Sequence, residues 1–370
     1  MERMSISQSE TLRLLYRNQF ASFLRFAFRQ VHPVKRFLQN WHIDHLTGLI
    51  TEIIEKRTTR AIINAPPRTL KSFITSIAYP VFALGQNPSL KIMVVAGNRK
   101  LAKELEHTAR MLLSAPAMAA VFPGLKGLEN RRPMQLGSGG QLTFGVYGKS
   151  VVGRGADIII VDDPLSPSEA NDDMLRAEAN EWFKSDLLPR LTERSTGAIL
   201  VVMQRLHPDD LTGMLLHGGD SWRHAAYPSV AAADEHWTLP NGEVSVRRKG
   251  EALHPAVLNR EQLLGILHQI GAVQFSAQYQ QNTSVRQEDR WGHWLGGHYD
   301  QAWYDNWTPE DGLERWFMGY VPEVWFLQYQ LFGEGSPPPE RYVAKLGEAK
   351  WQQVAILQQR RLLESMVEPE

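Results

Sequence analysis

A lysine and a serine stand where a strand-like apolar run gives way to a helix-like segment, a placement that suits phosphate chemistry. Residues 61–64 form the apolar run, and residues 72–84 have a helical pattern. The loop that joins them consists of Ala65, Pro66, Pro67, Arg68, Thr69, Leu70, Lys71 and Ser72. At such a helix start, backbone N–H groups can point at phosphates, a lysine can reach the β- and γ-phosphates, and a hydroxyl can ligate Mg²⁺. The loop therefore predicts an ATP-binding segment of the Walker A kind, with Ser72 as a metal ligand.

Both glycines of the usual G-x-x-x-x-G-K-[ST] pattern are missing from this loop. Ala65 and Leu70 occupy their positions. Glycine normally permits the close approach of the backbone to the phosphates, so Leu70 is the more serious departure. Taken alone, the loop is equally compatible with an ordinary strand–turn–helix unit that exposes a lysine.

Two carboxylates follow a second strand-like run. Residues 157–161 lead directly into Asp162 and Asp163. A nucleotide motor needs one carboxylate in the Mg²⁺ shell and a neighbour that polarises the attacking water. Asp162 suits the first role, as a Walker B metal ligand, and Asp163 the second, as a catalytic residue. An ordinary aspartate–proline turn is the alternative. The combination with Lys71 and Ser72 favours a nucleotide site.

A third strand-like run, residues 198–203, ends in Gln204 and Arg205. In parallel sheets the carboxyl ends of the strands face the bound nucleotide. Either side chain could therefore sense the γ-phosphate and act in catalysis. A charged loop tip without a role in catalysis is the alternative.

The order of the segments predicts the fold class. Further strand-like runs cover residues 91–96 and 141–146, and further helix-like segments cover residues 101–113, 169–188 and 209–216. Several runs are apolar almost throughout, as happens when helices cover both faces of a parallel sheet. We expect an α/β fold with a doubly wound, mostly parallel sheet of the P-loop NTPase type. The expected organisation is a helical N-terminal segment over residues 1–48, the ATPase domain over 49–285 and a divergent tail over 286–370.

The N-terminal segment has the pattern of a basic amphipathic helix. Residues 1–40 contain seven Lys or Arg residues and two Glu, and apolar residues recur near the helical period until His32 and Pro33. Such a helix could pack on the motor core or lie on a DNA or membrane surface.

The composition excludes several classes of protein. Lys plus Arg and Asp plus Glu number 40 each, so DNA would have to be held by a local patch or by a ring of subunits. The chain contains no cysteine, which rules out disulfides and cysteine-based zinc sites. No apolar run is long enough to cross a bilayer, and we expect no signal peptide.

Several short motifs occur in a fixed order along the chain. They are Trp41-His42, Pro66-Pro67-Arg68 with Lys71-Ser72, and residues 153–157, 162–165, 202–211 and 275–282. As an ordered set, over roughly residues 35–285, they resemble the large terminase subunit of tailed phages and prophages. In that group a Pro-Pro-Arg segment also precedes a variant phosphate loop, and a leucine before the lysine is tolerated.

The resemblance implies an ATPase that uses Mg²⁺ and drives double-stranded DNA into a procapsid. The expected partners are double-stranded DNA, a terminase small subunit and the capsid portal protein, on which the subunits would form a homo-oligomeric ring. The expected compartment is the cytoplasm of an infected or lysogenic bacterial host. By the same resemblance Arg154 is a candidate catalytic arginine, supplied in cis or by a neighbouring subunit. A loop arginine that binds a carboxylate or a DNA phosphate is the alternative.

The tail departs from this family, which normally continues into an RNase H-like nuclease with clustered aspartates. Residues 286–370 hold seven of the eleven tryptophans and no strand-like run that ends in such an aspartate. The acidic residues Asp300, Asp305, Glu310 and Asp311 lie in turn-like sequence. We therefore expect no nuclease activity in this chain.

Two other functions are compatible with parts of the sequence. A truncated, non-catalytic prophage remnant would bind nucleotide or partner proteins without turnover, and the missing glycines and nuclease favour it. The retained Lys71, Ser72, Asp162, Asp163 and Arg205 favour turnover. A helicase-like ATPase would use an aspartate–glutamate pair and a further core lobe, and the sequence shows neither.

Overall fold

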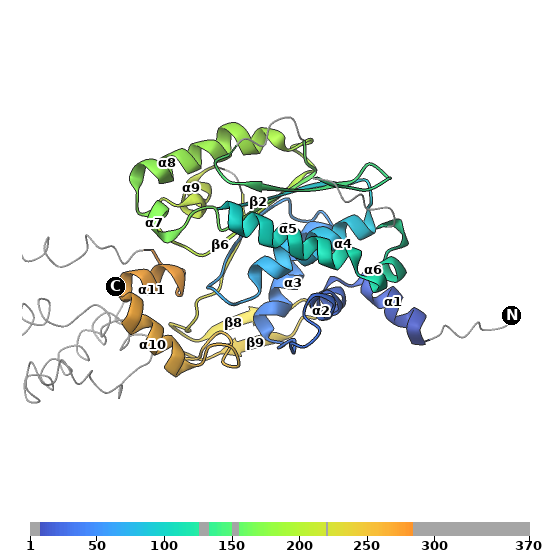
Figure 1. Ribbon diagram of the computed structural model, residues 1–370. Helices are drawn as coiled ribbons and strands as arrows, with labels where there is room; N and C mark the ends of the chain where they lie inside the picture. Colours follow the sequence, from blue (N-terminus) through green and yellow to red (C-terminus); the bar gives the residue numbers. More distant parts are fainter. Residues whose placement is uncertain (1–7, 126–132, 150–154, 220, 284–370) are drawn as a thin grey trace, which may run out of the picture.

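A parallel β-sheet forms the centre of the molecule (Figure 1). The computed structural model describes residues 8–125, 133–149, 155–219 and 221–283. In this part of the chain, the sheet has seven strands in the order β3-β4-β2-β5-β6-β1-β7, and only β3 and β4 pair antiparallel. The strands are β1 (Arg60–Asn64), β2 (Lys91–Ala96), β3 (Met134–Gln135), β4 (Gln141–Val146), β5 (Ile158–Asp162), β6 (Ala198–Met203) and β7 (Arg223–Ala226).

The strand order decides which loops can meet. β6 pairs with both β1 and β5, so it lies between the strand that precedes the lysine loop and the strand that ends in the acidic pair. These three strands are parallel, and therefore their carboxyl ends lie at the same edge of the sheet. That edge is where the predicted site residues gather.

Helices cover one face of the sheet in a large apolar core. They are α2 (Phe20–Val31), α3 (Trp41–Ile54), the π-helix η1 (Phe73–Ala78), α4 (Tyr79–Gln86), α5 (Arg99–Ser114) and α6 (Pro116–Val121). The strand residues that face them include Ile63, Ile160 and Leu200, all buried. The burial of many such side chains is the main favourable term for the fold.

A smaller core lies on the opposite face. Ile159, Val161 and Val201 point to this side, where α8 (Asp173–Trp182), the π-helix η3 (Phe183–Leu187) and α9 (Leu211–His217) pack. Figure 1 shows α8 and α9 on the side of the sheet away from α3. Since successive residues of a strand point to opposite faces, strands covered on both sides must be apolar throughout. The prediction of a doubly wound α/β fold with a mostly parallel sheet is confirmed.

The last described segment folds back towards the loop edge. It contains the hairpin of β8 (Glu235–Thr238) and β9 (Val244–Arg247), followed by α10 (Arg260–Ile270) and α11 (Ala272–Gln278). Short elements elsewhere are α7 (Pro167–Ala170), η2 (Pro123–Leu125) and η4 (Leu188–Arg190). None of the described helices is long and apolar enough to cross a membrane.

Two predicted helices are divided. The N-terminal segment forms α1 (Gln8–Asn18) and α2, separated at Gln19, which has an extended backbone. The predicted helix over residues 169–188 is divided into α7, α8, η3 and η4. Here Asp172 accepts the N–H groups of Met174 and Leu175 and so starts a new helix. The predicted boundary at residue 48 lies within α3, and the predicted tail lies outside the described residues.

Of the two interpretations of the N-terminal helix, packing on the core is the one found. Phe23 of α2 is fully buried and contacts the rings of Phe82 and Phe122 at centroid distances of 5.2 and 5.6 Å. Arg17 of α1 donates its Nε to the carbonyl of Val121 at 2.8 Å. These contacts bury α2 in the core and hold α1 against α6.

We predict that Phe23→Ala lowers the free energy of unfolding by about 3–5 kcal/mol, because it leaves a cavity among aromatic rings. Leu12 of α1 is 44% exposed, so Leu12→Ala should change the stability by less than about 0.5 kcal/mol. Urea unfolding followed by circular dichroism measures both values. Equal, small effects would contradict the assignment of α2 to the core.

Candidate nucleotide-binding site

The loop after β1 has two residues with left-handed backbone conformations, and neither is glycine. Leu70 has φ 63° and Arg68 φ 67°, both in the left-handed region. Leu70 thus takes the conformation for which glycine is ordinarily used at this position, at a cost of about 1–2 kcal/mol. Its side chain packs against the larger core, which offsets part of this strain. Thr69 closes the turn by donating its hydroxyl to the carbonyl of Pro66 at 2.8 Å.

Lys71 is buried at the start of the helix and points to the acidic strand. Its side chain is 7% exposed, and Nζ lies 3.0 Å from Oδ1 of Asp163. Nζ also donates to the carbonyl of Ala65 at 3.1 Å. A buried ammonium requires such partners, because its desolvation is costly. Lys71 is therefore held beside the loop, where a phosphate could replace the carboxylate of Asp163 as the partner of its ammonium group.

Asp162 is fully buried beneath the loop and accepts two hydroxyl groups. Ser72 Oγ donates to Oδ1 at 3.0 Å, and Ser76 Oγ donates to Oδ2 at 2.5 Å. Burial, and then the charge of Asp163, raise the pKa of Asp162 to about 7. Ser76 was not predicted from the sequence, and it reaches the carboxylate because it follows Ser72 by one helical turn.

The pair of Ser72 and Asp162 fits a magnesium ion. Both present oxygen atoms, the donors that Mg²⁺ prefers, and Mg²⁺ is usually held by one or two protein ligands together with phosphate oxygens. Within the described residues, no group of three or more acidic, histidine or cysteine side chains could hold a metal by itself. Ser72 and Asp162 therefore suit a metal ion whose other ligands come from a nucleotide.

Asp163 links the acidic strand to the end of β6. Its φ is 42°, and its Oδ1 accepts both Lys71 and the backbone N–H of Gln204, the latter at 3.1 Å. Gly97, at the end of β2, lies so close that a Cβ there would be 2.1 Å from the carbonyl oxygen of Asp163. The turn that carries Asp163 is thus held by contacts with the segments that follow β1, β2 and β6.

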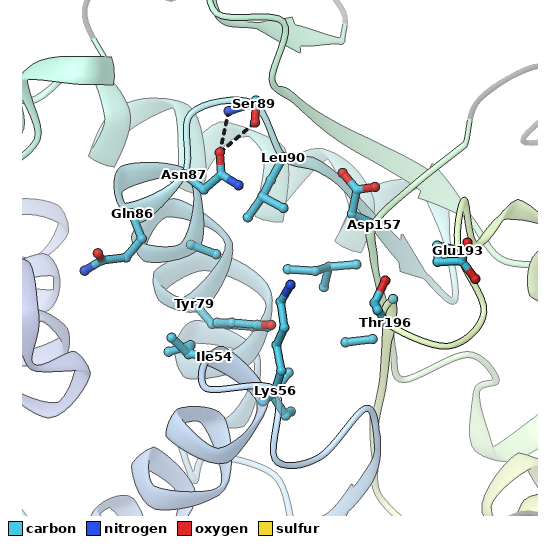
Figure 2. A pocket seen from close by; sticks show the side chains of 15 residues that line it. Ile54, Lys56, Tyr79, Gln86, Asn87, Ser89, Leu90, Asp157, Glu193 and Thr196 are labelled. Carbon is cyan, nitrogen blue, oxygen red and sulfur yellow. Dashed lines mark hydrogen bonds between the residues drawn. The ribbon is translucent and has the colours of Figure 1, made fainter.

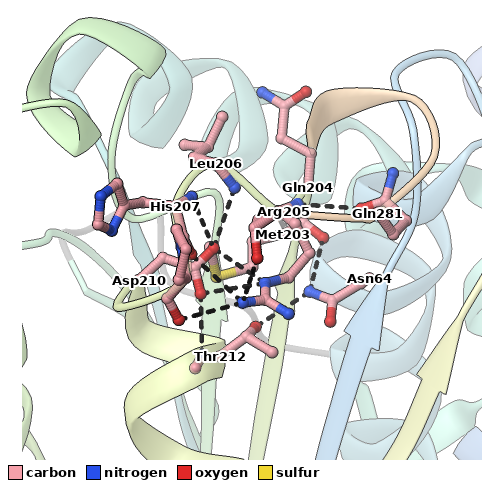
Figure 3. Close-up of polar contacts among 12 residues, drawn as sticks. Asn64, Met203, Gln204, Arg205, Leu206, His207, Asp210, Thr212 and Gln281 are labelled. Atoms are coloured by element: carbon pink, nitrogen blue, oxygen red, sulfur yellow. Dashed lines mark hydrogen bonds and ion pairs between the residues drawn. The ribbon is translucent and has the colours of Figure 1, made fainter. Parts of the chain in front are cut away.

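Gln204 and Arg205 have different environments (Figure 3). The Oε1 atom of Gln204 is buried and has no hydrogen-bond partner among the described residues. In contrast, the guanidinium of Arg205 forms an ion pair with buried Asp210, with Nε 3.1 and 3.0 Å from the two carboxylate oxygens. The geometry favours Gln204 over Arg205 as a group that is available to a phosphate or a water. Arg154, the other predicted arginine, lies outside the described residues.

A buried histidine supports the loop from below. His42 of α3 is fully buried, with Nδ1 2.5 Å from the amide nitrogen of Asn40 and Nε2 3.4 Å from the carbonyl of Thr69. Burial, followed by the nearby His254, lowers the pKa of His42 to about 3. The ring is therefore neutral at physiological pH, and Nε2–H is the donor to Thr69.

One cavity of the molecule lies away from this site. A cavity of about 410 Å³ lies at the other edge of the sheet, where β2, β5 and β6 begin (Figure 2). Its lining includes Lys56, Tyr79, Asp157 and Glu193, and none of the residues of the phosphate loop.

We predict that Asp162→Asn stabilises the nucleotide-free protein at pH 8 but has little effect near pH 4. The pKa of Asp162 in the folded protein is raised to about 7 from 3.8. The unfolded state therefore loses its proton first as the pH rises, and stability falls by about 1.4 kcal/mol per pH unit between pH 4 and 7. Urea unfolding in metal-free buffer measures this slope. A difference between variant and wild type that is the same at both pH values would refute the shift.

We also predict that Leu70→Gly is more stable than Leu70→Ala, which is the reverse of the order usual within a helix. Leu70→Gly and Leu70→Ala both lose the packed side chain, but only glycine relieves the left-handed strain, so it should be the more stable by about 1 kcal/mol. Leu101 of α5, also packed on the core, is the control. In this helix Leu101→Gly should be the less stable variant. The same order at both positions would contradict the strain at Leu70.

Solved structures to which the chain is similar include two phage proteins. No family model and no curated protein sequence matches the chain. The large terminase of bacteriophage HK97 is 13% identical over 58% of this chain and 44% of its own, with a TM-score of 0.36. A mutant ATPase domain of the large terminase of Thermus phage P74-26 is 15% identical over 68% of this chain and 96% of its own, with a TM-score of 0.42. The chain thus spans less than half the length of the HK97 protein.

Proposed function

We propose that this chain is the ATP-hydrolysing motor part of a phage terminase large subunit. The observation that carries the proposal is the cluster at the carboxyl edge of β1, β5 and β6. There Lys71 contacts Asp163 at 3.0 Å, and Ser72 contacts Asp162 at 3.0 Å. A lysine and a hydroxyl at a helix start, opposite two carboxylates, match the requirements of nucleoside triphosphate hydrolysis.

Each residue has a distinct task in this proposal. Backbone N–H groups of residues 65–72 and the ammonium of Lys71 hold the phosphates of ATP. Ser72 and Asp162 would hold Mg²⁺, which would supply positive charge to neutralise the phosphates. Binding of the phosphates to Lys71 frees Oδ1 of Asp163 from its ion pair. Asp163 and Gln204 can then orient a water whose oxygen attacks the γ-phosphorus. The bond from that phosphorus to the β-phosphate oxygen breaks, ADP leaves with the electron pair, and Asp163 accepts the proton that the water loses.

The coupling of hydrolysis to DNA movement is part of the same proposal. It includes double-stranded DNA, a small subunit and a capsid portal as partners of a homo-oligomeric ring, with Arg154 as the candidate arginine that completes the site in cis or from a neighbour. We also propose that the chain lacks nuclease activity. The acidic residues of the tail, such as Asp300, lie outside the described residues.

We predict that Lys71→Ala abolishes DNA-stimulated phosphate release and weakens ATP binding, because the phosphates lose their only buried cation among the described residues of the loop. Asp163→Asn should retain ATP binding but lower kcat by about a hundredfold or more, since it removes the group that polarises water. Phosphate release and binding of a fluorescent ATP analogue measure the two effects.

Lys103→Ala is the matched control, because Lys103 is exposed on α5. It should have the activity of the wild type. ATP binding by a wild-type protein that shows no turnover with DNA would support the non-catalytic remnant instead. Equal phosphate release by the wild type and Lys71→Ala would refute the nucleotide site itself.

A further inference from the structure

The last described residues return to the edge of the sheet where the site lies. Gln281, just after α11, has φ 55°, a left-handed conformation that is uncommon for glutamine. Its side chain is buried, and Oε1 accepts the backbone N–H of Arg205 at 2.9 Å, while Nε2 donates to the carbonyl of Gln278 at 2.7 Å. Figure 3 shows Gln281 against the loop that follows β6. A buried side chain held in a strained backbone points to a constraint beyond simple packing.

Two successive backbone N–H groups of this loop have side-chain acceptors from different parts of the chain. The N–H of Gln204 donates to Asp163, and the N–H of Arg205 donates to Gln281. The first bond holds the peptide unit between residues 203 and 204, and the second holds the unit between residues 204 and 205, so together they fix both peptide units that flank Gln204. Loss of the second bond would let the unit between residues 204 and 205 rotate and would loosen the first bond.

The Arg205 side chain is anchored independently of Gln281. Its guanidinium binds Asp210, the carbonyls of His207 and Pro208 at 3.3 Å, and the hydroxyl of Thr283 at 3.4 Å. Asp210 in turn accepts the backbone N–H groups of Leu206 and Gly213 at 3.0 and 2.9 Å. The loop is therefore rigid beyond residue 205, and the bond from Gln281 controls the short part that carries Gln204.

We propose that Gln281 is a positioning residue, which orients Gln204 and Asp163 for hydrolysis by holding the N–H of Arg205. Gln281 would then contribute to the geometry needed for hydrolysis, and displacement of its side chain would slow turnover. This inference rests on the proposed ATPase function. It adds a means by which the segment that leaves the ATPase core can regulate the chemistry.

The neighbouring Gln280 provides a matched control. Its side chain also forms two hydrogen bonds with backbone, accepting the N–H of Val230 at 2.9 Å and donating to the carbonyl of Val230 at 2.8 Å. Gln280→Ala and Gln281→Ala thus remove the same number of bonds from the same segment. Only the second variant affects the loop after β6.

The test measures steady-state ATP hydrolysis by the full chain in the presence of double-stranded DNA, and it compares the wild type with the variants. Gln281→Ala should lower kcat by about tenfold to a hundredfold, with KM for ATP changed by less than about twofold, because it displaces groups used in the transition state and spares the phosphate loop. Gln280→Ala should lose similar thermal stability and keep kcat near that of the wild type. Gln281→Glu keeps the acceptor for the N–H of Arg205 and should recover most of kcat. Equal kcat values for the two alanine variants, or no recovery in Gln281→Glu, would overturn the proposal.

A second measurement does not depend on turnover. Amide hydrogen exchange over residues 203–207 should become faster in Gln281→Ala and stay unchanged in Gln280→Ala. If the wild type hydrolyses no ATP, the proposed function fails, and the exchange experiment still decides whether Gln281 orients this loop. Unchanged exchange in Gln281→Ala would show that it does not.

Discussion

The ion pair between Lys71 and Asp163 joins the two segments on which the rest of the site depends. It bridges the loop after β1 and the turn after β5, although β6 lies between these strands. A buried ammonium without a partner would be costly, so the pair also keeps the loop closed against the sheet. Since the same carboxylate oxygen accepts the N–H of Gln204, one side chain draws the ends of three strands together. A phosphate that binds Lys71 would therefore also change the contacts of Asp163 with the end of β6.

Unusual backbone conformations gather around this pair. Leu70, Asp163 and Gln281 all have left-handed φ values, and none of them is glycine. Each such residue costs about 1–3 kcal/mol, which the surrounding structure must offset. The apolar strands β5 and β6, buried on both faces, supply a rigid platform for this purpose. The strained residues thus lie in the loop after β1, in the acidic turn after β5 and in the segment after α11.

The hydrogen bonds of Arg205 give it a structural role at the end of β6. A guanidinium committed to Asp210, two carbonyls and Thr283 stabilises a loop, whereas the buried Oε1 of Gln204 has no partner among the described residues. The same loop also contacts Gln281, so the central sheet and the segment after α11 share a hydrogen-bonded boundary. The proposed task of water orientation thus falls to Gln204, and the proposed positioning task falls to Gln281.

The sequence by itself determined the elements that local pattern can specify. The apolar runs identified the central strands, and the loop with Lys71 and Ser72 and the acidic pair identified the candidate site, because these signals are contiguous in the chain. Only the tertiary structure decided that β6 separates β1 from β5, that Ser76 joins Ser72 on Asp162, and that Arg205 is bound to Asp210. Gly97 lies against Asp163, which is 66 positions further along the chain. Gln281 binds Arg205, which is 76 positions before it. Such contacts follow from strand order and packing, which no local periodicity encodes.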